Sequence, residues 1–219
     1  TSSDKAANPT NVMGATKLLA EKLVTAASNY RGHRETVFAS VRFGNVLGSR
    51  GSALELFASQ ISAGGPVTMT DPAMTRFVMS TDRAVELCLE AASFAHGGEV
   101  FVFKMPVARL GDLVAAAIDA FAPSSGRDPA DIAVTTIPPR PGEKGYEELM
   151  TEDESSRAID IGEMFAVLPS IQTGLDVAAA YGHGRPAPVG PYRSDGGEIM
   201  DRETVLELLR TTLGTEMRA

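Results

Sequence analysis

Near the start of the chain, an aspartate and a lysine stand directly before an Asn-Pro turn and a long segment of helical periodicity. Pro9 disfavours helical backbone at the residue before it, so the chain must turn there before a helix can begin. From residue 11 to residue 29 apolar side chains recur at spacings of three and four, which predicts a helix packed against a sheet. Asp4 and Lys5 are therefore expected on a loop that joins a strand to a helix.

The residues of this junction allow two interpretations. Met13 and Lys17 are one turn apart on the same face of the expected helix. One interpretation is a capped loop and an amphipathic helix with a solvated lysine, which is what an Asp-Lys pair taken alone favours. The other interpretation is an active site. The complete string from Ser3 to Lys17 favours the active site, because it is far less expected by chance than the pair.

The rest of the chain alternates strand-like and helix-like segments, which is typical of an α/β fold. Strands are expected at residues 36–45, 66–69, 99–104, 133–137 and 164–168, and helices at residues 52–63, 81–95, 110–121 and 204–213. The first of these strands is rich in β-branched and aromatic residues, so we expect it to be buried and parallel, with a ligand site at its carboxyl end. Residues 147–157 are acidic and turn-like, and residues 182–197 are expected to form a loop or strap.

Composition narrows the class of function. The formal net charge of −8 and the lack of a basic stripe argue against a nucleic-acid partner. A single cysteine, Cys88, excludes an intrachain disulfide framework and a cysteine zinc cluster, and we expect it in the core. His33, His96 and His183 share no spacing that would indicate a metal site. No apolar run approaches the ~20 residues of a membrane span.

The string from Ser3 to Lys17 resembles the active-site segment of the extended short-chain dehydrogenases, in particular the bacterial polysaccharide-biosynthesis (CapD-like) nucleotide-sugar 4,6-dehydratases. In that family a Ser/Thr-Asp-Lys triplet precedes an Asn-Pro turn and a Tyr-Gly-Ala-x-Lys or Met-Gly-Ala-x-Lys helix start. Further blocks follow in the family's order at residues 41–52, 65–67, 70–77 and 140–144. The resemblance implies the C-terminal part of a doubly wound, Rossmann-like parallel sheet plus a small substrate-binding domain.

A domain of this family needs a glycine-rich turn after its first strand to hold the cofactor pyrophosphate. No Gly-x-x-Gly-x-x-Gly turn occurs in this sequence, so we expect the C-terminal portion of a longer protein. Residues 1–103 are expected to be the C-terminal half of the NAD-binding domain, residues 104–181 a substrate-binding region, and residues 182–219 a linker with a terminal helix. Taken alone, residues 1–219 are expected to be inactive. The resemblance implies a cytoplasmic, homo-oligomeric protein when complete, with a membrane anchor in some family members.

The resemblance also implies a set of catalytic roles. NAD or NADP is the implied cofactor, bound mainly by the missing N-terminal half, and a nucleotide sugar is the implied substrate. Lys17 matches the family lysine that orients the nicotinamide ribose, and Ser3 is expected beside the cofactor. We assign protonation of the departing C6 hydroxyl to Asp4 and removal of the C5 proton to Lys5.

Met13 occupies the position at which the family commonly carries a catalytic tyrosine. A thioether can neither take nor give the proton of the C4 hydroxyl. One explanation is an enzyme that has decayed to a binding protein. The other is an active site that relies more heavily on Asp4 and Lys5, and a catalytic branch of the family with the same methionine favours it. The base for the C4 hydroxyl stays unassigned.

Asn45 resembles the family asparagine that contacts the sugar diphosphate, and the later blocks offer Arg50, Ser52, Arg76, Arg140 and Glu143 as candidate substrate contacts. The arginines offer fork-shaped donors to a diphosphate, and the glutamate offers an acceptor for ribose hydroxyls. Each arginine taken singly is equally well explained as a surface charge or a helix-end pair, and the order of the surrounding blocks favours the substrate role. Gly145 stands where the family usually has leucine. Three functions remain open: a 4,6-dehydratase of UDP-N-acetylglucosamine, a 4-epimerase of the same superfamily, and a non-catalytic domain that binds sugar nucleotides. The Asp-Lys pair favours the dehydratase, because an epimerase relies on tyrosine chemistry and needs no acid at C6.

Overall fold

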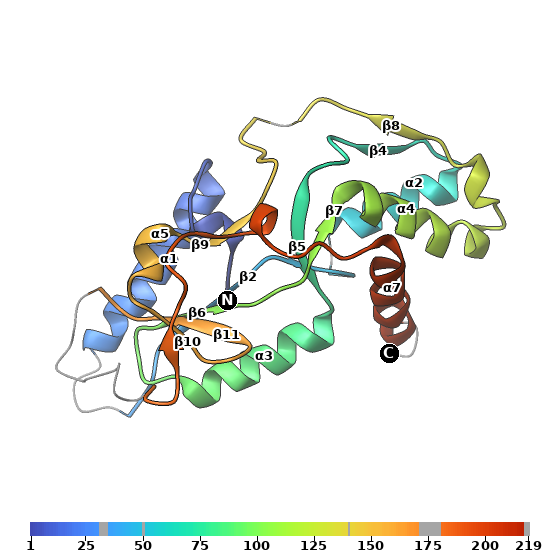
Figure 1. The fold of residues 1–219 in the computed structure, drawn as a ribbon. Coiled ribbons are helices and arrows are strands. Elements are labelled where there is room, and N and C mark those ends of the chain that lie inside the picture. The colour runs from blue at the N-terminus through green and yellow to red at the C-terminus, as the bar shows by residue number, and fades with distance from the viewer. Residues whose placement is uncertain (31–34, 50, 140, 171–180, 217–219) are drawn as a thin grey trace. The chain divides into compact units, whose positions relative to one another are not determined.

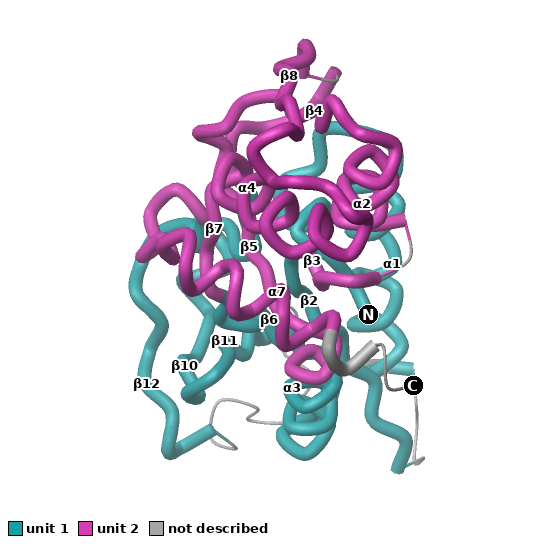
Figure 2. The backbone as a smooth tube through the Cα atoms, turned by 90° about the vertical axis from the view of Figure 1, so that its right-hand side faces the viewer, with its two compact units in different colours: residues 1–44, 85–105, 147–193 teal, residues 45–84, 106–146, 194–219 magenta. Residues whose placement is uncertain are grey.

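The computed structural model describes residues 1–30, 35–49, 51–139, 141–170 and 181–216 (Figure 1). The chain folds into two compact units and passes back and forth between them (Figure 2). Unit 1 comprises residues 1–44, 85–105 and 147–193, and unit 2 comprises residues 45–84, 106–146 and 194–219. These packing units are interleaved in sequence. The division by function into three consecutive segments, with boundaries after residues 103 and 181, stays a prediction.

Unit 1 is built on a six-stranded sheet in the order β1-β2-β6-β11-β10-β12. Its strands are β1 (Ser2–Ser3), β2 (Ser40–Phe43), β6 (Val100–Phe103), β11 (Met164–Val167), β10 (Ala158–Asp160) and β12 (Arg185–Pro186). The first three are parallel, with Arg42 opposite both Ser2 and Val102, and the others continue the sheet in antiparallel pairing. This arrangement confirms the expected α/β fold class.

The strand expected at residues 36–45 is shorter than predicted. β2 begins at Ser40, which lies opposite Val100, the first residue of β6. Among the described residues, no strand pairs with residues 35–39, and residues 35–38 are exposed. Asn45 is not part of β2, because a separate strand of unit 2 begins there. The available partner strand, rather than the β-propensity of the sequence, therefore decides the length of β2.

The segment expected to be acidic and turn-like, residues 147–157, instead contains a strand and a short helix of unit 1, and residues 147–150, 154 and 155 are buried. It forms strand β9 (Glu148–Met150) and the short helix α5 (Glu152–Ser155). Thr151 and Glu154 make a reciprocal capping box at the start of α5. Glu154 is only 6% exposed. This carboxylate is buried because it has a buried cationic partner elsewhere in the chain.

Strand β11 lies where a strand was expected at residues 164–168, and it is not the last strand of the chain. Two short strands follow it within residues 182–197, the segment predicted to be a loop or strap. β12 pairs with β10, and β13 (Tyr192–Arg193) pairs with β9. The Tyr192 hydroxyl donates to the Met105 carbonyl and accepts from the Met105 N–H, which ties β13 to the chain just beyond β6.

The helices of this part of the chain form where the sequence predicts them. Helix α1 (Val12–Tyr30) joins β1 to β2, and α3 (Thr81–Phe94) precedes β6. Cys88 of α3 is half-buried and not in the core as expected, because it lies at the margin of the buried stripe formed by Ala84, Leu87 and Ala91. Its partial burial raises the pKa of the thiol.

Unit 2 combines a three-stranded sheet, a two-stranded parallel sheet and a helical core. Its strands are β3 (Asn45–Val46), β5 (Thr75–Met79) and β7 (Val107–Arg109) in one sheet and β4 (Val67–Met69) and β8 (Val134–Thr136) in the other. Its helices are α2 (Ala53–Ala63), α4 (Leu110–Phe121) and α7 (Arg202–Glu216), with 3-10 turns η2 (Pro123–Ser125), η3 (Pro129–Asp131) and η4 (Ser194–Gly196). The strands expected from residues 66 and 133 and the helices expected from residues 52, 110 and 204 are all present.

Helix α4 organises the core of unit 2, where it contacts both α2 and α7 (Figure 1). Val114 of α4, Ile61 of α2 and Leu209 of α7 are each at most 1% exposed. Burial of one such side chain contributes about 1.5–3 kcal/mol. The apolar residues at helical spacing therefore account for how unit 2 is held together.

Candidate active site

The Asp4-Lys5 pair follows the carboxyl end of a parallel strand. β1 ends at Ser3, and the 3-10 turn η1 (Asp4–Ala6) begins at the next residue. Ser3 caps this turn, because its Oγ accepts a hydrogen bond from the Lys5 N–H at 3.3 Å. The carboxyl ends of parallel strands are where open α/β sheets bind ligands. The expected strand-to-helix loop is therefore confirmed, and it lies at the edge of the unit 1 sheet where a ligand would be expected.

The side chains of Asp4 and Lys5 bind each other. Lys5 Nζ lies 3.0 Å from Asp4 Oδ1 and 3.4 Å from Asp4 Oδ2. The side chain of Asp4 is 12% exposed and that of Lys5 is 42% exposed. A pair this accessible to water contributes little to stability. The contact places a carboxylate and an ammonium group together on one turn.

Helix α1 begins shortly after this turn and carries Met13 and Lys17. Asn11 caps the helix, since its Oδ1 accepts a hydrogen bond from the Gly14 N–H at 2.9 Å. Met13 is 58% exposed, and Lys17, one turn further along, is half-buried. The described part of unit 1 thus carries the predicted residues Ser3, Asp4, Lys5, Met13 and Lys17 on one strand-turn-helix segment.

Gly14 allows α1 to approach the Asp4-Lys5 turn closely. A Cβ atom at this position would lie 2.5 Å from the Lys5 carbonyl oxygen and 3.0 Å from the Pro9 Cβ. Both neighbours are held in the backbone or in a rigid ring, so neither can move aside cheaply. Glycine is therefore required after Met13 on steric grounds, because the first turn of α1 contacts the turn that carries Asp4 and Lys5.

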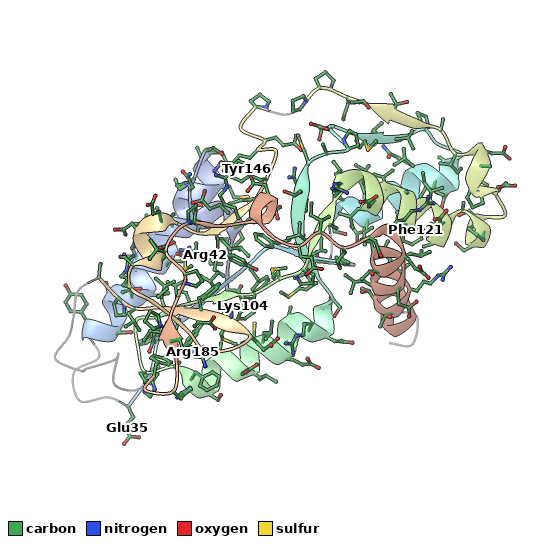
Figure 3. All side chains as sticks on the ribbon, viewed as in Figure 1. Glu35, Arg42, Lys104, Phe121, Tyr146 and Arg185 are labelled. Carbon is green, nitrogen blue, oxygen red and sulfur yellow. The ribbon has the colours of Figure 1, made fainter. Side chains whose placement is uncertain are left out.

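A buried arginine connects α1 to the sheet and to the segment 148–155. Arg42 of β2, labelled in Figure 3, is 0% exposed. Its Nε donates to Glu21 Oε1 at 3.0 Å and its Nη2 to Glu21 Oε2. The other side of the guanidinium donates to both carboxylate oxygens of Glu154 at 2.8 and 2.9 Å, and Nη1 also donates to the Leu149 carbonyl at 2.9 Å. We call Glu21, Arg42 and Glu154 the Arg42 cluster.

Electrostatics within the Arg42 cluster favours the charged forms. Burial by itself would lower the pKa of Arg42, but hydrogen bonds and charge from Glu21 and Glu154 outweigh burial and raise it. Burial would likewise raise the pKa of Glu154, yet the hydrogen bond and charge of Arg42 hold it below its usual value. The sequence pattern does not predict this cluster, because its three residues lie far apart in the chain. The available signal was an arginine placed between Val41 and Phe43 in a buried strand.

Strand β9 lies against η1 and brings another carboxylate near the turn. Glu148 is 9% exposed, and its Oε2 accepts from the Asn8 side-chain amide at 3.5 Å. Asn8 belongs to the Asn-Pro turn between η1 and α1. β9 therefore supports the backbone just after the Asp4-Lys5 pair, and its Leu149 carbonyl binds Arg42 at the same time.

The predicted substrate residues that the structure describes lie in unit 2. Arg76 Nη2 is 3.5 Å from Glu143 Oε1, and the Thr70 hydroxyl donates to the same oxygen at 3.2 Å. Asn45 Nδ2 donates to the Phe77 carbonyl at 2.9 Å. The structure thus brings together Arg76 and Glu143, which are 67 residues apart in the chain.

The remaining predicted residues of this group are less informative. Ser52 precedes α2, and its buried Oγ has no hydrogen-bond partner among the described residues. Arg50 and Arg140 lie outside the described residues. Gly145 has no neighbour within 4 Å of a built Cβ, so its side-chain position has room for the leucine that the family usually carries.

The described residues form neither a metal-ligand cluster nor a membrane-spanning helix. Within the described ranges, no group of three His, Cys, Asp or Glu side chains is arranged to hold a metal ion. His96 and His183 instead lie beside the aromatic rings of Tyr181 and Phe94. His33 lies outside the described residues. None of the helices in the described part of the chain is both long and apolar enough to cross a membrane.

A sheet whose first three strands are parallel, with an Asp-Lys turn at the carboxyl end of β1, defines the class as an α/β protein. Residues 1–169 match the model of the polysaccharide biosynthesis protein family, and the chain belongs to that family. Its resemblance to CapD-like proteins is thereby confirmed.

Individual relatives agree with this assignment. The chain is 54% identical over 209 residues to an uncharacterised membrane protein of Methanocaldococcus jannaschii, covering 95% of this chain and 60% of that protein. It is 48% identical over 155 residues to the capsular polysaccharide biosynthesis protein CapD of Staphylococcus aureus, covering 70% of this chain and 25% of CapD. It is 37% identical over 212 residues to a UDP-glucose 4-epimerase of Rickettsia canadensis, covering 96% of this chain and 60% of that enzyme.

A solved structure resembles this fold closely. Pen from Bacillus thuringiensis superposes with a TM-score of 0.85 at 41% identity, covering 97% of this chain and 61% of Pen. The chain therefore spans about 60% or less of the length of the relatives that it matches.

Proposed function

We propose that the complete protein is an NAD-dependent nucleotide-sugar 4,6-dehydratase acting on UDP-N-acetylglucosamine for polysaccharide or modified-sugar synthesis. The observation that carries this proposal is the 3.0 Å contact between Lys5 Nζ and Asp4 Oδ1 at the carboxyl end of β1. A 4,6-dehydratase needs a base at C5 and an acid at C6 of the sugar. Two neighbouring residues that hold one proton between them supply both.

The first proposed step is a proton transfer within the Asp4-Lys5 pair. In contact with water, the pair consists of a Lys5 ammonium and an Asp4 carboxylate. When a bound sugar excludes water, the ion pair loses its hydration, and the neutral pair becomes relatively more favourable. The proton then moves from Lys5 Nζ to Asp4 Oδ1 along the 3.0 Å hydrogen bond. A neutral amine and a carboxylic acid result.

The elimination then uses both neutral groups. The Lys5 amine takes the C5 proton, which the ketone at C4 acidifies, and becomes an ammonium. The electron pair of the C5–H bond forms the C5–C6 double bond as the C6–O bond breaks, and Asp4 gives its proton to the leaving hydroxyl, which departs as water. Asp4 and Lys5 end in the charged forms in which they began, so the elimination consumes no proton from outside the pair.

The chain also carries residues suited to hold the cofactor. When bound, NAD supplies the acceptor for hydride from C4 and the donor that returns it at C6. Lys17 is half-buried on α1 and offers an ammonium to ribose hydroxyls. Ser3 Oγ accepts from the Lys5 N–H and keeps its own proton available for donation. The donors are thus of the type that a nicotinamide ribose requires, and we propose that these two residues hold it.

Unit 2 supplies groups for the nucleotide part of the substrate. We propose that Arg76 binds the diphosphate and that Glu143 accepts from ribose hydroxyls, with Asn45, Ser52, Arg50 and Arg140 as further contacts. The ion pair between Arg76 and Glu143 supports this assignment, because it holds a cationic fork and an acceptor at one place in unit 2.

A second candidate is a nucleotide-sugar 4-epimerase. The relatives named UDP-glucose 4-epimerase, which include the Rickettsia canadensis enzyme, favour it. Met13 argues against it, because a thioether cannot exchange a proton with the C4 hydroxyl. An epimerase also has no use for an acid aimed at C6. The third candidate, a domain that binds sugar nucleotides without turnover, is distinguished by experiment.

The test uses the complete protein with UDP-N-acetylglucosamine and NAD in deuterated water, followed by NMR. A 4-keto-6-deoxy product with deuterium at C5 is expected. A product inverted at C4 that keeps its C5 hydrogen would establish the epimerase instead. Binding of the nucleotide sugar without any product would establish the non-catalytic domain.

A further inference from the structure

We propose that Arg42 is a positioning residue that, acting through Glu21, sets the placement of Lys17 on α1. The expected effect on catalysis rests on the proposed function. The contacts that support the inference all lie within unit 1. Nothing in the sequence blocks that carry the family resemblance singles out Glu21 or Glu154 for such a part.

Every N–H group of the Arg42 guanidinium donates a hydrogen bond. Nε has one N–H and gives it to Glu21, while the two N–H groups of Nη2 go to Glu21 and Glu154. The two N–H groups of Nη1 go to Glu154 and to the Leu149 carbonyl. Because all of the donors lie in one plane and each has an acceptor, the carboxylate of Glu21 can take only one orientation.

Lys17 lies between two points at which α1 is fixed. Gly14, three residues earlier, is in close contact with the Lys5 carbonyl. Glu21, four residues later, is 3% exposed and bound to Arg42. Residues at spacings of three and four share one helix face. The face that carries Lys17 therefore can neither rotate nor slide while both contacts hold.

The charges of the Arg42 cluster suit it to restrict geometry rather than to stabilise the fold. A buried ion pair is commonly no more stabilising than apolar residues of similar volume, because burial costs the hydration of each charge. A cluster of two carboxylates and one guanidinium is therefore a poor device for stability. Its directional bonds restrict geometry, and through Leu149 they also fix β9, the strand that lies against the Asp4-Lys5 turn.

The test compares two variants of the complete enzyme, Glu21→Gln and Glu154→Gln. Each substitution replaces one of the two carboxylates that bind Arg42 with a neutral amide. Only Glu21 belongs to α1. We expect Glu21→Gln to lower kcat by about 10- to 100-fold, as small displacements of catalytic groups do, and to leave the KM for the nucleotide sugar unchanged. Glu154→Gln should have a Tm as low as that of Glu21→Gln and a much smaller loss of kcat. Asp153→Asn, which breaks an exposed pair with Arg157, is the matched surface control and should behave as wild type.

A second measurement is independent of turnover. Acetylation with limiting acetic anhydride, followed by mass spectrometry, gives the rate at Lys17 relative to Lys22, an exposed lysine on the same helix. This ratio should rise in Glu21→Gln and stay at the wild-type value in Glu154→Gln. Equal ratios and equal kcat in the two variants would overturn the inference. If the wild type makes no 4-keto-6-deoxy product, the proposed function fails, and the acetylation ratio still decides whether Arg42 places Lys17.

Discussion

The ammonium of Lys5 lies 3.0 Å from the carboxylate of Asp4, one residue before it, at the point where β1 ends. Neighbouring residues on an extended strand point to opposite faces of a sheet and could not meet in this way. They meet because the chain enters the 3-10 turn η1 at Asp4. The change from strand to turn therefore creates the acid-amine pair on which the proposed chemistry depends.

Removal of either member of the pair should have a different effect on the C5 proton. Lys5→Met should abolish both exchange at C5 with deuterated water and formation of the product. Asp4→Asn should slow the exchange at neutral pH, because the asparagine cannot take the proton of Lys5. NMR of the sugar measures both. Normal C5 exchange in Lys5→Met would contradict the assignment of the base.

Substitution Gly14→Ala should reduce stability and activity together. Alanine is intrinsically better in a helix by about 0.8–1 kcal/mol, but the added Cβ would lie 2.5 Å from the Lys5 carbonyl. Relief of that overlap costs about 1–3 kcal/mol, so a net loss is expected. Gly196→Ala is the control, because a Cβ there meets nothing within 4 Å and its φ is not positive. Urea denaturation of both variants compares the two costs.

The Arg42 cluster should make unit 1 sensitive to acid. The pKa of Glu154 is lowered in the folded state, so its contribution to stability is present above its ordinary value of about 4.3 and is lost as pH falls through the lowered pKa. Arg42 stays protonated throughout and adds no pH dependence of its own. The urea midpoint of the wild type should therefore decrease between about pH 5 and pH 3. In Glu154→Gln this decrease should be smaller.

The pair formed by Arg76 and Glu143 should be visible in nucleotide preference. If Glu143 accepts from ribose hydroxyls, Glu143→Gln should reduce the preference of the complete enzyme for UDP over 2′-deoxy-UDP by about 1–2 kcal/mol. Calorimetric titration of both nucleotides into wild type and variant gives the difference. If the preference is unchanged, Glu143 does not bind the ribose hydroxyls. Its ion pair with Arg76 is then structural.

Local pattern was sufficient for most of the helices. Helix α4 occupies residues 110–121, as expected, because its apolar spacing and its boundaries are both properties of the segment itself. β2 is shorter than its β-branched sequence suggests, because the first residue of β6 decides where pairing begins. The acidic segment 147–157 forms a strand and a short helix rather than a turn, and the sequence could not indicate the burial of Glu154, because its partner Arg42 is 112 residues away.

By itself, the sequence determined the strand-turn-helix junction at Asp4 and Lys5 and the family to which the chain belongs, because short-range periodicity, turn residues and ordered blocks are written in consecutive residues. Only the tertiary structure decided that Glu21, Arg42 and Glu154 form one buried cluster and that Arg76 meets Glu143. Hydrogen bonds and ion pairs depend on distances in space, and here those distances join residues that lie tens of positions apart in the chain.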